Sequence, residues 1–182
     1  AIRDVYKRQP IAYRKSLMNI QFEIFNSRGK KVADAFSLWI LLDMKQKIPC
    51  RNKFEDMFEV YGLKASENKI NTMKKINISK NLINTKKLNV GYCDIDTNGH
   101  VNNVKYLYWI LDTISEDIVK DYKITKLRIS YKKSANYSDI ITLSFTKNIE
   151  NKLIVYSHKI ADKENSVLVL AETVLQKSYV DK

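Results

Sequence analysis

The sequence contains few of the features that mark secreted, disulfide-bonded or membrane-spanning proteins. It has two cysteines, Cys50 and Cys93, whose spacing fits neither a CxxC motif nor a metal site, so we expect free thiols in a reducing compartment. No apolar run approaches the length of a membrane span, and no signal or transit peptide is visible. These absences favour a bacterial cytoplasmic protein with no membrane span over a secreted or plastid protein.

Acidic residues are also scarce relative to basic ones. The chain has 32 Lys and Arg against 20 Asp and Glu, which gives a formal net charge of +12. Such a charge can belong to lysines spread over a solvated surface, or it can indicate an acidic partner such as nucleic acid or an acidic carrier protein. No helix-turn-helix, zinc-finger or RNP-like motif is present, and the lysines do not cluster on one predicted helix. We therefore predict no nucleic-acid partner.

The composition that remains is that of a globular protein. A chain of 182 residues with 45% hydrophobic and 10% aromatic residues can form one large domain or two small ones. The first residue is not Met, and residues 1–9 show no clear hydrophobic period before Pro10. We interpret residues 1–9 as non-native sequence and leave them out of the fold prediction.

The first half of the chain predicts a β-hairpin followed by a polar stretch. Apolar and polar residues alternate toward the end of residues 11–26, and this alternation predicts a strand. A turn with a glycine over 26–29 leads to a second strand over 32–43, whose nearly continuous apolar core indicates burial on both faces. Residues 54–61 suit a short amphipathic helix within a linker over 50–74.

The second half predicts a strand, one long helix and then several antiparallel strands. Residues 84–90 lead into the polar turn, and helical spacing of apolar residues over 101–119 predicts a largely buried helix. The final strands are predicted at 124–133, 140–148, 152–162 and 166–179. This order indicates an α+β fold in which an antiparallel sheet wraps around one helix.

Two predicted hairpins also have similar sequences. Ile24-Phe-Asn26 and Ala35-Phe-Ser-Leu-Trp39 match Ile160-Ala-Asp162 and Ala171-Glu-Thr-Val-Leu175 at a constant offset. The match is either a coincidence between two hairpins or a true repeat. In a true repeat the second unit would begin near residue 75, and about sixty residues of the first unit would be absent from this chain.

Three polar residues, Asp96, Asn98 and His100, lie at alternate positions in the turn of Gly91–Leu111. In an extended segment alternate side chains face the same side, so we expect these three to converge. Imidazole is a base near neutral pH, a carboxylate can orient it, and an amide can hold a carbonyl or a water molecule. Backbone N–H groups at the start of the following helix, near Gly99–Val101, could stabilise an oxyanion. The set suits hydrolysis of an ester-like bond.

The same residues also fit a purely structural interpretation. Asn98 could cap the helix, Asn102 and Asn103 could satisfy local backbone groups, and His100 could be an ordinary half-buried histidine. A metal site is disfavoured because the segment holds one histidine and few carboxylates, and we predict no cofactor.

The longer segment resembles the signature of a known enzyme family. Asp94-Ile-Asp96-Thr-Asn98-Gly-His100-Val-Asn-Asn103-Val-Lys-Tyr106-Leu-Tyr-Trp109-Ile-Leu111 is similar to the motif of the acyl-acyl-carrier-protein thioesterases, the plant plastid FatA and FatB enzymes and their bacterial relatives. Phe22–Asn26 and Ser37–Asp43 resemble the closing hairpin of the family's first domain. Tyr131–Asp139 resembles the strand and turn that face its active site.

The resemblance implies a tandem hotdog fold, in which each antiparallel sheet wraps around a long central helix. Residues 10–49 would be the C-terminal part of an incomplete first hotdog, 50–74 a linker, and 75–182 the second, catalytic hotdog. The implied reaction is hydrolysis of the thioester between a fatty acyl chain and the phosphopantetheine arm of acyl carrier protein. This reaction releases free fatty acid and ends fatty acid synthesis.

The resemblance also assigns site residues. The catalytic positions of the family map onto Asp96, Asn98 and His100. Where the family usually has a glutamate, three residues after Tyr131, this chain has Ser134, which exchanges hydrogen bonds but is no base near neutral pH unless it is activated. The candidate substrate-binding residues are Gly99, Val101, Asn102 and Trp39.

Two alternatives keep the fold and change the function. One is an acyl-CoA thioesterase, and the other is a catalytically weakened acyl-binding hotdog protein, which the serine at position 134 motivates. The basic composition favours the acidic carrier protein over coenzyme A. A homodimer is an assembly that the sequence leaves open.

Overall fold

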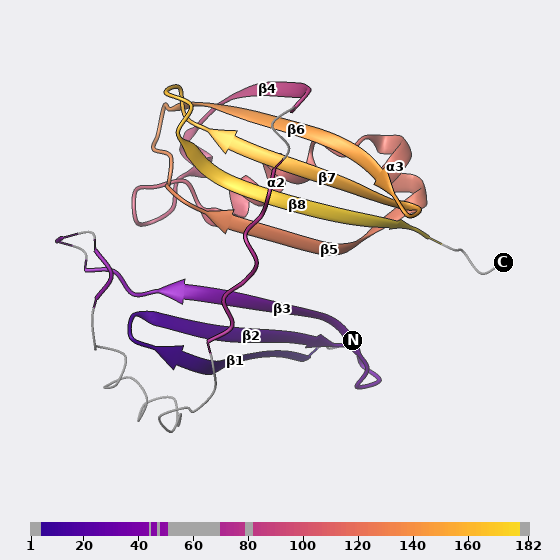
Figure 1. Ribbon diagram of the computed structural model, residues 1–182, viewed down its shortest axis with the longest axis horizontal. Coiled ribbons are helices and arrows are strands. Elements are labelled where there is room, and N and C mark those ends of the chain that lie inside the picture. The colour runs from indigo at the N-terminus through magenta and orange to yellow at the C-terminus, as the bar shows by residue number, and fades with distance from the viewer. Residues whose placement is uncertain (1–4, 44, 47, 51–69, 79–81, 179–182) are drawn as a thin grey trace. The chain divides into compact units, whose positions relative to one another are not determined.

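The computed structural model describes residues 5–43, 45–46, 48–50, 70–78 and 82–178. The chain divides into two compact units, Ala1–Lys74 and Lys75–Lys182 (Figure 1). The predicted helix over 54–61 and most of the predicted linker lie outside the described residues. Within the described part of the chain, no helix is both long and apolar enough to cross a membrane.

Unit 1 contains a three-stranded antiparallel sheet, β1 (Val5–Arg14), β2 (Leu17–Phe25) and β3 (Lys31–Ile40), in that order. Residues 5–9, which the sequence prediction left out of the fold, form the first half of β1. The single strand predicted over 11–26 is also wrong. The chain turns at Lys15, which has a φ of 55°, and folds back as β2.

The predicted turn between β2 and β3 is confirmed. The Asn26 side-chain oxygen accepts the N–H groups of Arg28 and Lys30, both at 3.0 Å. Gly29 has a φ of 72°, a conformation that glycine adopts without a Cβ penalty. The predicted burial of the following strand on both faces is wrong for the described residues, because Trp39 and Ile40 are about half exposed.

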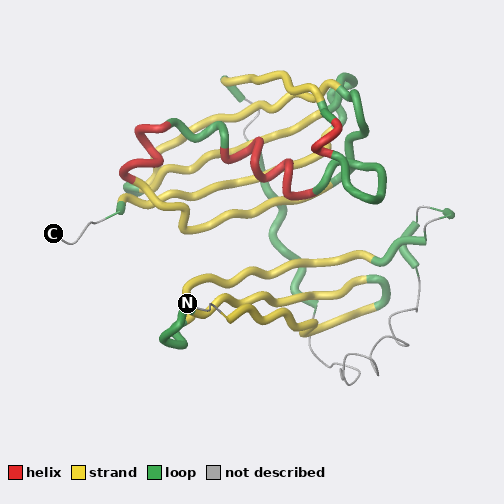
Figure 2. Tube along the Cα trace, turned by 180° about the vertical axis from the view of Figure 1, so that it is seen from behind, coloured by secondary structure: helices red, strands yellow, loops and turns green. Residues whose placement is uncertain are grey.

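Unit 2 is a five-stranded antiparallel sheet with its helices along one face (Figure 2). The strand order is β4-β6-β7-β8-β5, so β4 and β5 form the edges. The predicted strands are confirmed, with shifts of their ends by up to a few residues. Their bounds are β4 (Asn84–Asn89), β5 (Tyr122–Tyr131), β6 (Ile140–Glu150), β7 (Leu153–Ala161) and β8 (Val167–Lys177).

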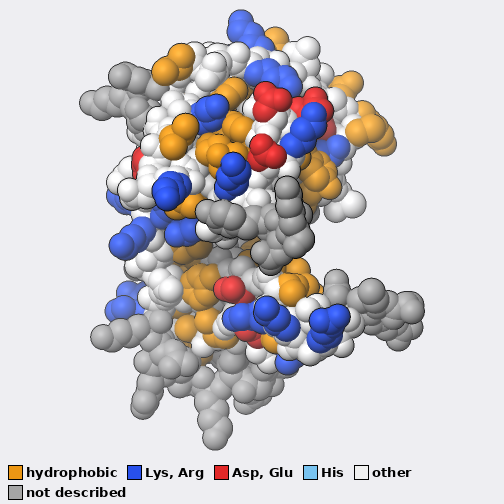
Figure 3. All heavy atoms as spheres, turned by 90° about the vertical axis from the view of Figure 1, so that its right-hand side faces the viewer, with side chains coloured by type: hydrophobic (Ala, Val, Ile, Leu, Met, Phe, Trp, Pro, Cys, Tyr) orange, Lys and Arg blue, Asp and Glu red, His pale blue; other side chains and the backbone are white. Residues whose placement is uncertain are grey.

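The predicted long helix is instead two short ones, α2 (Asn103–Leu111) and α3 (Glu116–Asp121). The Thr113 hydroxyl donates to the Ile110 carbonyl at 2.7 Å, and a side chain that bonds the backbone in this way competes with the continuing helix. In Figure 3 the side that carries α3 in Figure 1 faces the viewer, and acidic and basic side chains lie intermixed on it.

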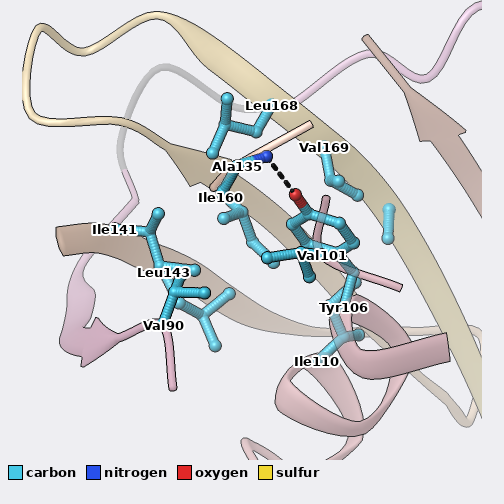
Figure 4. Packing of buried hydrophobic residues seen from close by; sticks show 11 residues of the cluster. Val90, Val101, Tyr106, Ile110, Ala135, Ile141, Leu143, Ile160, Leu168 and Val169 are labelled. Carbon is cyan, nitrogen blue, oxygen red and sulfur yellow. Dashed lines mark hydrogen bonds between the residues drawn. The ribbon is translucent and has the colours of Figure 1, made fainter. Parts of the chain in front are cut away.

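The burial of α2 also differs from the prediction. The helix was predicted to be largely buried, but only Tyr106 and Ile110 of α2 are buried, and Val104 and Tyr108 are 49% and 56% exposed. Figure 4 shows the two buried side chains packed against residues of the sheet. The main core cluster consists of Val90, Val101, Tyr106, Ile110, Ala135, Ile141, Leu143, Ile160, Leu168, Val169 and Ala171.

The sequence similarity between the two hairpins corresponds to a repeat in the structure. β2 and β3 occupy the positions of β7 and β8 at the same sequence offset, and the registers agree. Leu17 pairs with Ile40 as Leu153 pairs with Gln176, and both hairpins shift register at the equivalent place, Ile24/Phe25 and Ile160/Ala161. The repeat extends to β1, which pairs with β2 as β6 pairs with β7. Unit 1 therefore repeats the β6-β7-β8 part of unit 2.

Candidate active site

The signature segment forms a tight hairpin and not the extended run that was predicted. Ile95 and Val101 form an antiparallel bridge, and the Asp96 N–H donates to the His100 carbonyl at 2.9 Å. The turn closes where the Gly99 N–H donates to the Asp96 carbonyl at 3.0 Å, with Gly99 at a φ of 77°. Asp96 and His100 therefore come together because they lie opposite each other across a hairpin, and not because alternate residues share a face.

The hairpin is held by the residues on either side of it. The Asp94 carboxylate accepts the Gly91 N–H at 2.9 Å and forms an ion pair with Lys105 at 3.3 Å, while its carbonyl accepts the Asn102 N–H at 2.8 Å. Asn102 caps α2 by accepting the Val104 N–H at 2.9 Å. The capping interpretation is thus correct for Asn102 but wrong for Asn98.

The segment 132–139, between β5 and β6, runs beside the hairpin. The Val101 N–H donates to the Ala135 carbonyl at 3.0 Å, and the Ala135 N–H donates to the Tyr106 hydroxyl at 2.7 Å (Figure 4). The Tyr131 hydroxyl donates to the Asn103 carbonyl at 3.1 Å, at the start of α2. These bonds join Val101, the residue after His100, to Ala135, the residue after Ser134.

Sequence reasoning missed the part played by Tyr106. Its ring is buried and packs edge-on against Trp109 and Tyr131, with centroid distances of 5.4 and 6.1 Å. Burial raises the pKa of the Tyr106 hydroxyl, which the Ala135 hydrogen bond partly offsets. The signal was available, because the tyrosine and tryptophan of the signature follow the histidine at helical spacing. Their role in fixing residue 135 required the tertiary structure.

The predicted catalytic residues differ in their surroundings. Asn98, His100 and Ser134 are exposed, and Asp96 is half-buried with its carboxylate accepting the Asn98 N–H at 2.8 Å. Among these four described residues, no hydrogen bond joins one side chain to another. Trp39 belongs to unit 1, where it is 49% exposed and its indole N–H donates to the Ser37 hydroxyl at 2.8 Å.

Of the backbone N–H groups predicted near Gly99–Val101 as oxyanion donors, only that of His100 has no acceptor among the described residues. The N–H groups of Gly99, Val101 and Asn102 already donate to carbonyls within the chain. The N–H groups of His100 and Asn103 have no acceptor among the described residues. These two amides are therefore the ones at this end of α2 that remain able to bind a negatively charged oxygen.

The other histidine, His158, lies in the core of unit 2. It is fully buried, its Nε2 lies 2.9 Å from the Thr113 hydroxyl oxygen, and its ring stacks on Tyr156. Burial lowers its pKa to about 4, so the ring is neutral at physiological pH. Among the described residues, no group of three or more His, Cys, Asp or Glu side chains could hold a metal ion.

An antiparallel sheet packed along one face by a helix, with a polar hairpin at the start of that helix, defines the hotdog fold. A protein of Lactobacillus plantarum shares it over 96% of this chain and 68% of its own, with a TM-score of 0.85 and 18% identity. A 12:0-ACP thioesterase from Umbellularia californica shares the fold over 97% of this chain and 76% of its own, with a TM-score of 0.74 and 18% identity. These likenesses establish the fold.

The family follows from the sequence. The model of the acyl-ACP thioesterase C-terminal domain matches residues 77–177, and that of the N-terminal domain matches residues 5–61. The chain belongs to the acyl-ACP thioesterase family. It is 27% identical over 119 residues to a chloroplastic palmitoyl-acyl carrier protein thioesterase of Cuphea hookeriana. That match covers 62% of this chain and 28% of the Cuphea protein, so the chain spans less than a third of this curated relative.

Proposed function

We propose that this protein hydrolyses the thioester of fatty acyl-acyl carrier protein and releases free fatty acid. The observation that carries the proposal is the hairpin of residues 95–101, in which Asp96 and His100 lie opposite each other beside Ser134 at the start of α2. The hairpin and the start of α2 carry a base, a carboxylate, a side-chain amide and two backbone N–H groups without an acceptor among the described residues. That combination is what attack of water on an acyl carbonyl requires.

In the proposed reaction His100 accepts a proton from water while the water oxygen bonds to the thioester carbon. Asp96 orients the imidazole, and Asn98 holds the water or the carbonyl. The N–H groups of His100 and Asn103 stabilise the negative charge that develops on the carbonyl oxygen. The carbon–sulfur bond then breaks, and the imidazolium returns its proton to the leaving thiolate. The products are a fatty acid and the free pantetheine thiol.

The proposed partner is an acidic carrier protein, and the proposed compartment is the bacterial cytoplasm. The surplus of basic residues supports an acidic partner, because charges of opposite sign speed association and favour the correct complex. Cys50 and Cys93 are both free thiols, which fits a reducing compartment. A homodimer remains a prediction.

The test is acid release from long-chain acyl carrier protein thioesters by the purified full chain. We expect His100→Ala to lower kcat/KM by about 10²–10⁴-fold, the usual contribution of a general base. Asp96→Asn should lower it by a smaller factor. Asp117→Asn, an exposed carboxylate on α3, is the matched control and should leave the rate unchanged. If both site variants hydrolyse as fast as the parent protein, the assignment is wrong. If the acyl-CoA ester is hydrolysed faster than the carrier ester, the proposed substrate is wrong.

Position 134 favours a second candidate, an acyl-binding protein with weakened catalysis. A serine hydroxyl can hold a water molecule but does not take its proton near neutral pH without activation. Ser134→Glu separates the candidates, because a large gain in hydrolysis would reveal a disabled site, whereas an unchanged rate would show that serine suffices. Thr97→Glu adds the same charge at the exposed tip of the hairpin and controls for charge alone.

A further inference from the structure

We propose that Lys132, Lys133, Tyr137 and Tyr92 form a docking surface for the acidic carrier protein, named here the basic rim. The proposal rests on the proposed function, because it identifies the surface through which the same site would receive its substrate. It goes beyond that function by assigning the contact to four residues outside the signature. The partner to which it commits is an acidic protein that carries its acyl group on a phosphodiester-linked arm.

The position of the basic rim follows from the segment that carries it. The Ala135 carbonyl of segment 132–139 accepts the Val101 N–H. At its other end, the Ser138 N–H donates to the Val90 carbonyl at 3.1 Å, and the Asp139 carbonyl accepts the Val90 N–H at 2.9 Å. The segment therefore connects the catalytic hairpin with the strand end that precedes Tyr92.

The side chains of the basic rim point into solvent although their backbone is fixed. The N–H groups of Lys132 and Lys133 both donate to the Leu168 carbonyl, at 2.8 and 3.3 Å. Both lysines are exposed, Tyr137 is 62% exposed and Tyr92 is 85% exposed. Exposed tyrosines on a rigid backbone add contact area at a low cost in conformational entropy, which is why such residues are enriched in protein interfaces.

The charge of the basic rim is not neutralised by its neighbours. No acidic side chain among the described residues forms an ion pair with Lys132 or Lys133. The nearby carboxylates are engaged elsewhere. Asp94 pairs with Lys105, Asp96 accepts the Asn98 N–H, and Asp139 accepts the Asn136 N–H. Two unpaired positive charges therefore stand directly beside Ser134.

The α3 side of unit 2 does not share this property. Acidic and basic side chains are intermixed there (Figure 3), and Lys120 forms an ion pair with Glu116 at 2.8 Å. A negatively charged partner would gain attraction at the basic rim that the mixed surface around α3 does not supply. The local charge, and not the net charge of the chain, would thus select the face on which the carrier protein docks.

The test compares two double variants that remove the same charge. Lys132→Ala/Lys133→Ala neutralises the basic rim. Lys147→Ala/Lys152→Ala removes two exposed, unpaired lysines near the turn between β6 and β7, at the opposite end of the sheet from the site. Each full-chain variant is assayed with a fatty acyl-acyl carrier protein and with the same acyl group on N-acetylcysteamine, which carries no charge. Binding of acyl-free, phosphopantetheine-bearing carrier protein is measured separately by fluorescence anisotropy.

For each protein we divide kcat/KM for the carrier substrate by kcat/KM for the neutral thioester. We expect this ratio to fall by about tenfold in the rim variant, through a higher KM for the carrier substrate. The remaining activity on the carrier substrate should depend less on salt concentration. The anisotropy Kd should rise by a similar factor, and the control variant should change neither quantity. Equal losses on both substrates, or equal losses in the two double variants, would overturn the proposal.

The binding measurement keeps this proposal separate from the proposed function. If the parent protein binds the carrier protein through the lysines but hydrolyses no thioester, the docking surface stands and the enzymatic function fails. If it hydrolyses the thioester and the rim variant binds the carrier as tightly as the parent, the enzymatic function stands and the docking surface fails.

Discussion

At the scale of single residues, the signature divides into side chains that build the site and side chains that are free to react. Asp94, Asn102, Tyr106 and Trp109 each hold a turn, a helix end or a neighbouring segment in place. Asn98 and His100 project into solvent. The first group explains why the motif extends well past the histidine, because the hairpin needs partners on both sides to keep its shape.

The buried histidine allows a prediction about acid stability. The Thr113 hydroxyl gives its proton to the Ile110 carbonyl, so His158 must donate its Nε2–H to the Thr113 oxygen. Its Nδ1 is then a buried acceptor without a partner among the described residues. A proton added there would place a charge in the core, which is why the folded-state pKa lies near 4 and below the ordinary value of 6.5.

Because the unfolded chain takes up this proton at a higher pH than the folded chain, stability should fall as pH falls from about 6.5 to about 4. The expected loss from this residue is about 3 kcal/mol in the free energy of unfolding. Denaturant unfolding at a series of pH values measures it. His158→Gln keeps a hydrogen-bond donor for Thr113 but removes the titratable group. The variant should therefore lose about 3 kcal/mol less free energy of unfolding than the parent protein over this pH range. Identical pH profiles for the parent and His158→Gln would contradict this account.

At the scale of elements, the hairpin of residues 95–101 depends on a glycine in the left-handed region. Gly99 has a φ of 77°, and a Cβ built there would meet no atom within 4 Å, so backbone conformation alone sets the cost of a side chain. Gly91 differs, because its φ is −95° and a Cβ would lie at an ordinary contact distance of 3.6 Å from the Asp94 carboxylate.

We therefore expect Gly99→Ala to lower the free energy of unfolding by about 1–2 kcal/mol and to reduce thioester hydrolysis by displacing His100. Gly91→Ala, the matched control, should be neutral or slightly stabilising, because it restricts only the unfolded chain. Chemical denaturation and the hydrolysis assay give both readouts. A loss of stability in Gly91→Ala equal to that in Gly99→Ala would show that the conformation of Gly99 is not the cause.

The success of element prediction depended on whether the signal was local. The hairpin turn at 26–29 and the strands of unit 2 follow from turn residues and alternation that lie within each segment. The prediction of one continuous helix failed because the apolar spacing continues past the break. At the break the Thr113 hydroxyl donates to the Ile110 carbonyl and also contacts His158, a residue far along the chain. The extent of burial of α2 was overestimated, because a helix that is apolar on several sides does not indicate which side meets the sheet.

At the scale of the whole molecule, the described core belongs almost entirely to unit 2. Of the buried apolar residues, Ala12 and Ile20 are the members that lie in unit 1. The β2-β3 pair repeats the register of β7 and β8, but Tyr6 and Ile24 on the three-stranded sheet remain 60% and 36% exposed. In unit 2 the equivalent sheet positions pack against α2.

This asymmetry predicts different behaviour of the two units as separate fragments. Residues 75–182 should fold alone and show one cooperative thermal transition, because they contain both buried clusters. Residues 1–74 should show no cooperative transition, because the described part of unit 1 buries little apolar surface and so cannot offset the loss of chain entropy. Circular dichroism melting curves of the two fragments and the full chain test this, and a cooperative transition in fragment 1–74 would contradict it.

The sequence by itself determined the features that depend on neighbours along the chain. These are the strand alternation, the turn residues, the repeated hairpins, the charge surplus and the signature that places the chain in its family. The tertiary structure decided what depends on residues far apart in sequence. It showed that Asp96 and His100 meet across a hairpin, that Tyr106 fixes Ala135, and that the amides of Gly99 and Val101 are already bonded. The physical reason is that periodicity and turn chemistry are properties of short segments. The partner of a particular N–H or hydroxyl group is chosen only when distant segments pack together.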